Sequence, residues 1–200
     1  MDIYLIRHSR VKVSSDTCYG QTDVLLADSF LEEVQNIKKQ LPDFTQAVLM
    51  ITSPLQRCLQ LAQQLSLHQD NHIVIDKRLM EINFGKWEMQ KWHEIDSALL
   101  QEWMNDYVHL APPQGESYQA LLKRCQDFWQ ALLKQKVSTV LVITHAGVIR
   151  ALIALMLEMP LKNAFTIQID YGSVSKIKYH QDAITNWITI EYLNRVHNGG

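Results

Sequence analysis

Four short runs of apolar residues, many of them β-branched, constrain the fold of this chain more than any other feature of its sequence. They occupy positions 3–6, 47–51, 72–75 and 139–143, and each has the length and composition of a strand buried on both faces. Strands of this kind occur almost only in sheets that are covered by helices on both sides. We therefore expect an α/β fold with a largely parallel sheet between two layers of helices.

The segments between and after these runs have the patterns that such a fold requires. Five segments predict helices, at positions 28–41, 55–65, 89–110, 116–136 and 148–157. The tail predicts three more strands, at 165–169, 173–179 and 187–192. Ser53 and Pro54 predict the start of the second helix, as an N-cap and a first helical residue. The late strands are expected to form an antiparallel part of the sheet.

The composition is that of an ordinary globular protein, because 47% of the residues are hydrophobic, 20% are charged and the formal net charge is −2. It indicates neither a nucleic-acid nor a membrane partner. A length of 200 residues suits a single domain, placed at residues 1–200, and leaves the oligomeric state open. The first residues lack the pattern of a signal peptide, and Cys18, Cys58 and Cys125 have the scattered spacing of free thiols, so we expect a cytoplasmic protein.

Charged and titratable side chains recur where the predicted strands end. Arg7 and His8 follow the first strand directly, and His145 follows the run at 139–143. Arg57 lies one turn inside the helix after the second strand, from which its side chain leans back toward the strand end. Glu81 stands among apolar neighbours in an irregular segment. Since ligands of open α/β sheets bind beyond the carboxyl ends of the strands, we expect these five side chains to share one crevice.

Each of these residues has a structural interpretation that is the more common one for an isolated residue. A single histidine after a strand is most often a hydrogen-bonded loop residue. Arg57 alone could form a surface ion pair, and Glu81 alone could be an exposed loop carboxylate. The joint occurrence of two histidines, two arginines and a carboxylate at one rim favours a functional site.

Phosphoryl transfer is the chemistry that needs this set of side chains. Arginines match phosphate oxygens with a planar fork and keep their charge at any relevant pH. A histidine among cations stays neutral and can attack phosphorus, whereas a carboxyl group beside a phosphate dianion favours its protonated form and can protonate a leaving alkoxide. A divalent-ion site would need clustered carboxylates, so we expect no metal and no cofactor.

Four motifs resemble those of the histidine phosphatase superfamily, in its phosphoglycerate mutase-like branch. They read LIRH, TSPLQRCLQLA, EINFGKWE and ITHAGVIRAL, and they occur in the same order as in that family along nearly the whole chain. The short spacing from the first motif to CYGQTDVLL further resembles the α-ribazole phosphatases and related small phosphatases.

This resemblance implies a three-layer α/β/α sandwich with a mostly parallel central sheet. It implies that His8 is transiently phosphorylated, that Arg7, Arg57 and His145 hold the phosphoryl oxygens, and that Glu81 acts first as acid and then as base. By the same resemblance, the stretch Gln21-Thr22 contacts the phosphate or the leaving group. The implied substrate is a small phosphate ester, with α-ribazole 5'-phosphate of cobalamin biosynthesis as the leading candidate.

The sequence departs from the family pattern at three places. Ser9 stands where glycine commonly follows the nucleophilic histidine, and Met89 also replaces a usual glycine. Leu25-Leu26 stands where the related motif usually carries a proline. These changes bear on substrate preference more than on catalysis.

Two other functions stay open at this point. A phosphoglycerate mutase would use the same residues, although mutases of this branch generally have a longer connection after the glutamate motif and a capping tail. A non-catalytic module could bind phosphorylated ligands through the same arginines, but it would have no need of the acid Glu81.

Several further features favour structural roles. The pair His68 and His72 lacks the glutamate of a metalloprotease helix, so a zinc site is not expected. Cys58 is interpreted as a packed core residue, and Arg150 as a member of a structural ion pair. Ser117 or Glu116 is expected to cap a helix. Packing is also the expected role of three aromatic residues, Trp87, Trp92 and Trp103.

Overall fold

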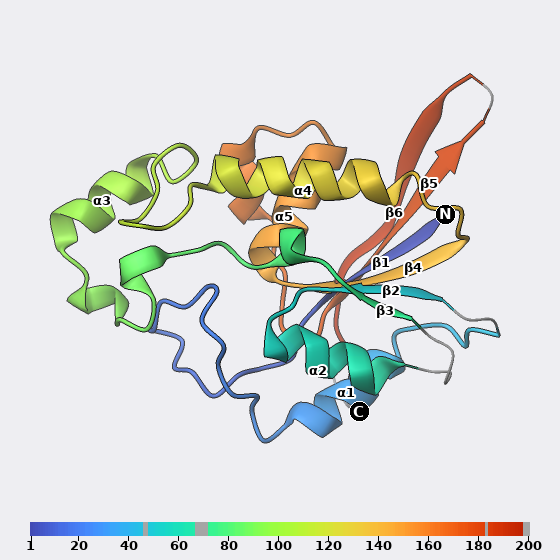
Figure 1. Cartoon of the computed structure of the whole chain (residues 1–200), viewed down its shortest axis with the longest axis horizontal. Helices are drawn as coiled ribbons and strands as arrows, with labels where there is room; N and C mark the ends of the chain where they lie inside the picture. The colour runs from blue at the N-terminus through green and yellow to red at the C-terminus, as the bar shows by residue number, and fades with distance from the viewer. Residues whose placement is uncertain (46–47, 67–71, 183, 198–200) are drawn as a thin grey trace.

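A single mixed sheet of six strands organises the computed structural model, which describes residues 1–45, 48–66, 72–182 and 184–197. In chain order the strands are β1 (Asp2–Arg7), β2 (Leu49–Thr52), β3 (Ile73–Ile75), β4 (Thr139–Thr144), β5 (Val174–Gln181) and β6 (Asn186–Arg195). Their spatial order is β3-β2-β4-β1-β5-β6. The first four run parallel, and β5 and β6 are antiparallel additions at one edge (Figure 1). The predicted fold class, a mostly parallel sheet within an α/β fold, is confirmed.

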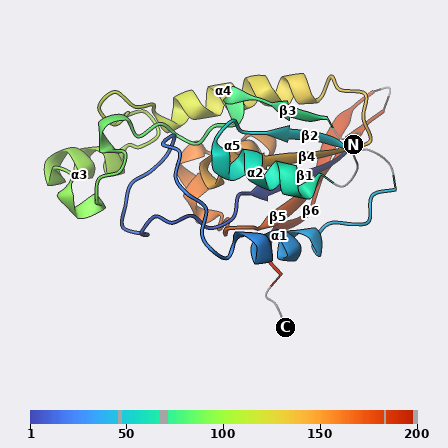
Figure 2. The same cartoon turned by 60° about the horizontal axis from the view of Figure 1, so that its bottom comes forward.

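Helices cover both faces of this sheet. They are α1 (Phe30–Lys38), α2 (Gln56–Leu65), α3 (Ser97–Asn105), α4 (Tyr118–Leu132) and α5 (Ala146–Met156). Alternate residues of β1 serve the two layers: Ile3 and Leu5 pack with α4 and α5, and Tyr4 and Ile6 pack with α1 and α2. In Figure 2, α4 and α1 accordingly lie on opposite sides of the sheet. None of the described helices has the length and apolar composition that crossing a membrane would need.

The predicted strand at 72–75 is present as β3, but the expectation that it is buried on both faces was wrong. β3 is the outermost strand on its side of the sheet, and Val74 and Ile75 are exposed. An apolar run at a sheet edge has the same composition as one at the centre, so the pattern alone does not separate the two. The predicted strand at 47–51 corresponds to β2, with Ala47 outside the described residues.

The helix predicted at 89–110 was also wrong in most of its length. Only α3 is α-helical there, and it begins after Asp96, whose side chain accepts hydrogen bonds from the amides of Ala98 and Leu99. Met89 has a φ of 66°, a left-handed conformation that a helix cannot include and that glycine adopts most easily. Figure 1 shows α3 at the left, beyond the end of the sheet.

One predicted strand and one predicted helix start also differ from the structure. The stretch 165–169, predicted as a strand, is not one: its first two residues end the 3-10 helix Leu161–Thr166, whose Ala164 is fully buried in the core, and its last three are irregular. The second helix has Leu55 rather than Ser53 as its N-cap residue. Ser117 does cap α4 as expected, since its hydroxyl accepts from the amide of Ala120 at 3.2 Å.

Candidate active site

The carboxyl ends of three neighbouring strands bring the candidate residues together. The amide of His8, just after β1, donates to the carbonyl of Thr144 at the end of β4 (3.0 Å). The amide of Ser53, just after β2, donates to the carbonyl of Ile143 (3.0 Å). The rings of His8 and His145 therefore lie side by side, with their centroids 5.1 Å apart. The rim that the sequence predicted at the strand ends is present.

His8 is held in one orientation by the backbone of the next residue. Its ring is 2% exposed, and Nδ1 lies 2.7 Å from the carbonyl oxygen of Ser9. A carbonyl oxygen only accepts, so Nδ1 carries the proton and Nε2 carries the lone pair. Burial, then the charges of Arg57 and Arg7, hold the pKa of His8 well below its ordinary value of 6.5. His8 is thus a neutral imidazole whose Nε2 has no hydrogen-bond partner within the described part of the chain.

The guanidinium of Arg7, the residue before His8, has an N–H donor without a hydrogen-bond partner among the described residues. Its guanidinium stacks on the ring of Tyr171, with the central carbon 3.6 Å from the ring centroid, and Nη1 donates to the carbonyl of Ile169 (2.7 Å). Its buried Nε has no partner among the described residues. A buried donor of a fixed cation that lacks a partner is a place for an anion.

Arg57 is fully buried beneath a loop rather than open to the crevice. Nε donates to Nδ1 of His145 (3.3 Å), Nη1 to the carbonyl of Thr22 (3.0 Å), and Nη2 to the carbonyl of Gly20. These contacts use three of the five N–H groups of the guanidinium. The charge of Arg57 is therefore close to both histidines, while all three guanidinium nitrogens donate to protein acceptors.

His145 has both ring nitrogens engaged. Because Nδ1 accepts from Arg57, Nε2 carries the proton and donates to the hydroxyl of Ser53 (2.8 Å). Burial, then the charge of Arg57, holds the pKa of His145 well below 6.5. In this arrangement the ring orients Arg57, and binding of a phosphoryl oxygen by His145 requires one of these two bonds to open.

The two buried histidines make stability depend on pH. Because the pKa of each is lower in the folded chain than the ordinary 6.5, the unfolded chain binds more protons as the pH falls below 6.5. We expect the free energy of unfolding to fall between pH 7 and 5, by up to about 1.4 kcal/mol per pH unit for each histidine. Urea unfolding of His8→Gln should show a shallower decline than wild type, whereas the exposed His93→Gln should match wild type. Equal slopes in His8→Gln and wild type would contradict this assignment.

Glu81 is anchored at the start of α5. Its carboxylate accepts from the amide of Gly147 (Oε2, 3.1 Å) and from the amide of Ile82 (Oε1, 3.0 Å). A Cβ on residue 147 would lie 2.3 Å from Glu81 Oε1, so the carboxylate needs glycine at that position. Gly147 is two residues from His145, and this contact places the predicted acid beside the histidine pair.

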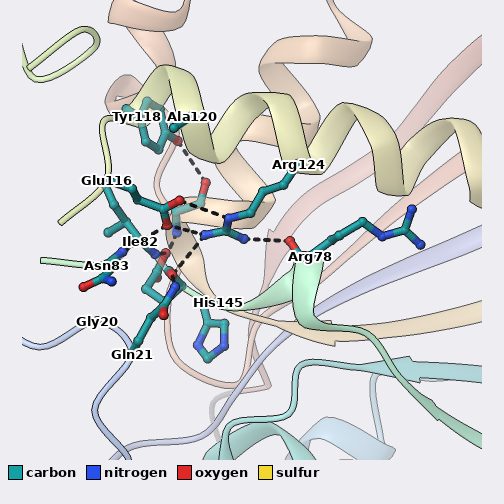
Figure 3. A network of polar contacts seen from close by, with 12 residues as sticks. Gly20, Gln21, Arg78, Ile82, Asn83, Glu116, Tyr118, Ala120, Arg124 and His145 are labelled. Atoms are coloured by element: carbon teal, nitrogen blue, oxygen red, sulfur yellow. Dashed lines mark hydrogen bonds and ion pairs between the residues drawn. The ribbon is translucent and has the colours of Figure 1, made fainter. Parts of the chain in front are cut away.

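A partly buried ion pair that the sequence analysis did not anticipate fixes the backbone around Glu81. Arg124 of α4 binds the carboxylate of Glu116 (2.6 Å) and also donates to the carbonyls of Glu81 (3.0 Å) and Arg78 (2.6 Å). Figure 3 shows Arg124 between Glu116 and Arg78. The amide of Asn83 donates to Glu116 (3.0 Å). The sequence contained no local signal for this pair, since the two residues were seen only as parts of a helix start and a helix.

Gln21 and Thr22 lie in the site, but their polar groups contact protein. The side-chain amide of Gln21 donates to the carbonyl of Glu81 (2.9 Å). The amides of both residues, and the hydroxyl of Thr22, donate to the carboxylate of Glu88. Partial burial alone would raise the pKa of Glu88, but the hydrogen bonds from Thr22, Gln21 and Phe84 lower it. Glu88, part of the quoted motif EINFGKWE but given no role there, thus fixes the loop whose carbonyls bind Arg57.

Two tyrosines also contact the site and were missed. The hydroxyls of Tyr19 and Tyr171 are 2.6 Å apart, which joins the loop after β1 to the turn before β5. The Tyr171 ring lies 5.5 Å from that of His8, and the Tyr19 ring lies 5.4 Å from the guanidinium carbon of Arg57. These contacts come from segments far apart in sequence, and no local pattern indicated them.

The remaining candidates have the following positions. Cys58 is buried in the core, where burial raises the pKa of its thiol. The expected ion pair of Arg150 was wrong: Nε donates to the carbonyl of Ile167 (2.8 Å), and no described carboxylate pairs with it.

Trp87 packs with Cys18 and Ile95 in a small separate cluster, with Trp92 and Trp103 at its edge. Ser9, the departure after His8, is fully buried, and its hydroxyl has no partner among the described residues. His68 lies outside the described residues. Within the described part of the chain, no group of three or more metal-binding side chains is present.

Comparisons with known proteins agree with this geometry. A profile of the histidine phosphatase superfamily (branch 1) matches residues 3–188. The adenosylcobalamin/alpha-ribazole phosphatase of Escherichia coli (strain K12) is 30% identical over 190 residues, covering 92% of this chain and 93% of that protein. The crystal structure of the alpha-ribazole phosphatase from Shigella flexneri superposes with a TM-score of 0.87 at 28% identity, covering 98% of this chain and 96% of the other. A mycobacterial glucosyl-3-phosphoglycerate phosphatase shares the fold, with a TM-score of 0.82 at 22% identity over 96% of this chain and 98% of its own.

Proposed function

We propose that this chain, which belongs to branch 1 of the histidine phosphatase superfamily, hydrolyses a small phosphate monoester. In this proposal the reaction passes through a phosphohistidine on His8 and needs no metal ion. Family membership makes the chain a phosphatase whose substrate is a phosphate ester. The mechanism, the roles of the residues and the substrate are the parts proposed. We also propose that residues 1–200 form one domain, since one sheet includes strands from both ends of the chain.

The state of His8 is the observation that supports this mechanism best. Its Nδ1 proton is held by the Ser9 carbonyl, its Nε2 is free, and its low pKa keeps it neutral. Nε2 attacks phosphorus in line with the leaving oxygen, forming a P–N bond while the ester P–O bond breaks. The cations of Arg7 and Arg57 stabilise charge on the equatorial oxygens, and His145 orients Arg57. Gln21 and Thr22 stay at the edge of this phosphate pocket.

Glu81 completes the two steps of the cycle. Its protonated carboxyl gives its proton to the departing alkoxide, and the resulting carboxylate then removes a proton from the attacking water. Water attack breaks the P–N bond, releases inorganic phosphate and restores neutral His8. The amide of Gly147 at the start of α5 holds the carboxylate in place between the two steps.

The leading specific substrate is α-ribazole 5'-phosphate, by analogy with the relatives from Escherichia coli and Shigella flexneri that are named alpha-ribazole phosphatases. The test has two parts. Hydrolysis of p-nitrophenyl phosphate in EDTA should proceed with release of phosphate, and α-ribazole 5'-phosphate should have the highest kcat/KM in a panel of phosphorylated metabolites. Interconversion of phosphoglycerates without phosphate release would instead identify a mutase, and binding of phosphate esters without turnover would identify a non-catalytic module.

A further inference from the structure

We propose that an aromatic cavity beside Glu81 binds the alcohol half of the substrate and that it selects a flat, uncharged aromatic ring system. The inference rests on the proposed function and adds to it the chemical class of the leaving group. The cavity has a volume of about 380 Å³. That size is within the range of small-molecule sites. Six aromatic side chains line it: Phe84, Trp92, Trp103, Tyr107, Tyr118 and Phe165.

The cavity wall is tied to the predicted acid at two points. Ile82, another lining residue, follows Glu81 directly in the chain. The hydroxyl of Tyr118 donates to the carbonyl of Gly147 (2.9 Å), and the amide of the same glycine donates to the Glu81 carboxylate (3.1 Å). An alcohol that receives its proton from Glu81 leaves beside this wall. A group attached to that alcohol is thereby assigned to the cavity.

The chemistry of the lining specifies what the cavity can hold. The only hydroxyls in the aromatic lining belong to Tyr107 and Tyr118, and both donate to backbone carbonyls, of Lys162 and Gly147. The rings support one another edge to face, with centroids 5.0 Å apart for Tyr107 and Phe165. Such a preformed aromatic wall favours a flat apolar ring. The cavity is also open to water at Phe165, which is 51% exposed.

A cation beside the cavity narrows the ligand further. The guanidinium of Arg150 lies over Phe165 (5.1 Å to the ring centroid) and has no ion-pair partner among the described side chains. A cationic leaving group would be repelled there.

The test compares two substrates that share the phosphate but differ in the alcohol. 4-Methylumbelliferyl phosphate carries a flat bicyclic ring with acceptor oxygens, and glycerol 2-phosphate carries none. Phe165→Ala removes a half-exposed ring, so the fold should persist. We expect its kcat/KM to fall about three- to tenfold for the aryl ester and to change less than about twofold for glycerol 2-phosphate. Leu31→Ala, an equally exposed apolar residue on α1, should leave both values unchanged.

Binding of the free alcohol separates this inference from the proposed function. 4-Methylumbelliferone should bind wild type in equilibrium dialysis and bind Phe165→Ala at least threefold more weakly. Equal binding by wild type and Phe165→Ala, or an equal loss of kcat/KM for the two esters, would overturn the inference. If no ester is hydrolysed but the ring binds as described, the proposed function fails and the cavity assignment stands.

Discussion

His8→Ala is expected to retain less than about one thousandth of the wild-type kcat on every phosphate monoester. The reason is that the proposed reaction has no first step without Nε2, and the fully buried Arg57 and His145 offer no replacement nucleophile. Phosphate release from p-nitrophenyl phosphate under saturating conditions measures the effect. Loss of kcat, rather than a rise in KM, is the expected signature, because the cations that bind the phosphate remain.

The controls for His8→Ala address folding and specificity. His8 is buried, so the variant should be compared with wild type by circular dichroism and urea unfolding before its activity is interpreted. His93→Ala, which alters an exposed histidine, should keep full activity. A folded His8→Ala enzyme with more than a tenth of the wild-type kcat would refute nucleophilic catalysis by this residue.

Glu81→Gln should have the second largest effect, and its size should depend on the leaving group. The amide oxygen can still accept from Gly147, so the local structure is preserved while the transferable proton is lost. A loss of about 10²–10⁴ in kcat is expected for an alkyl ester such as glycerol 2-phosphate. For p-nitrophenyl phosphate, whose leaving group needs no proton, the rate of phosphoenzyme formation should fall much less.

Rapid-mixing kinetics can isolate that first step. The burst of p-nitrophenol should persist in Glu81→Gln, while steady-state turnover slows because the base for water attack is missing. Glu102→Gln, an exposed carboxylate on α3, serves as the matched control and should behave as wild type. Equal losses for alkyl and aryl esters would indicate a structural or binding role for Glu81 instead of proton transfer.

The sequence predicted the strand-end geometry because that geometry is local. Arg7 and His8 directly follow one apolar run, His145 follows another after a single threonine, and parallel strands place their carboxyl ends at one edge of the sheet. Arg57 was located by its place one turn inside a helix. The family resemblance assigned roles to these positions, and the structure places them together.

The contacts that the sequence did not predict are long-range. Tyr19 and Tyr171 are 152 positions apart, and Glu88 reaches Thr22 across 66. Nothing in either local segment indicates the partner. The helix predicted over 89–110 was wrong for a different reason: the left-handed Met89 stands at its first position, a 3-10 turn occupies Trp92–Glu94, and the α-helix is limited to Ser97–Asn105. In this segment the helix propensity of the sequence is overridden by the backbone conformation and by packing in the small cluster around Trp87.

Trapping the phosphoenzyme tests the central claim most directly. Enzyme mixed briefly with p-nitrophenyl phosphate should be quenched in alkali, digested and mapped by mass spectrometry. The account predicts one phosphoryl group, on the peptide containing His8, stable to base, lost in acid and absent from His8→Ala. A phosphoryl group on another residue, or full turnover with no phosphorylated His8 at any time, would contradict it.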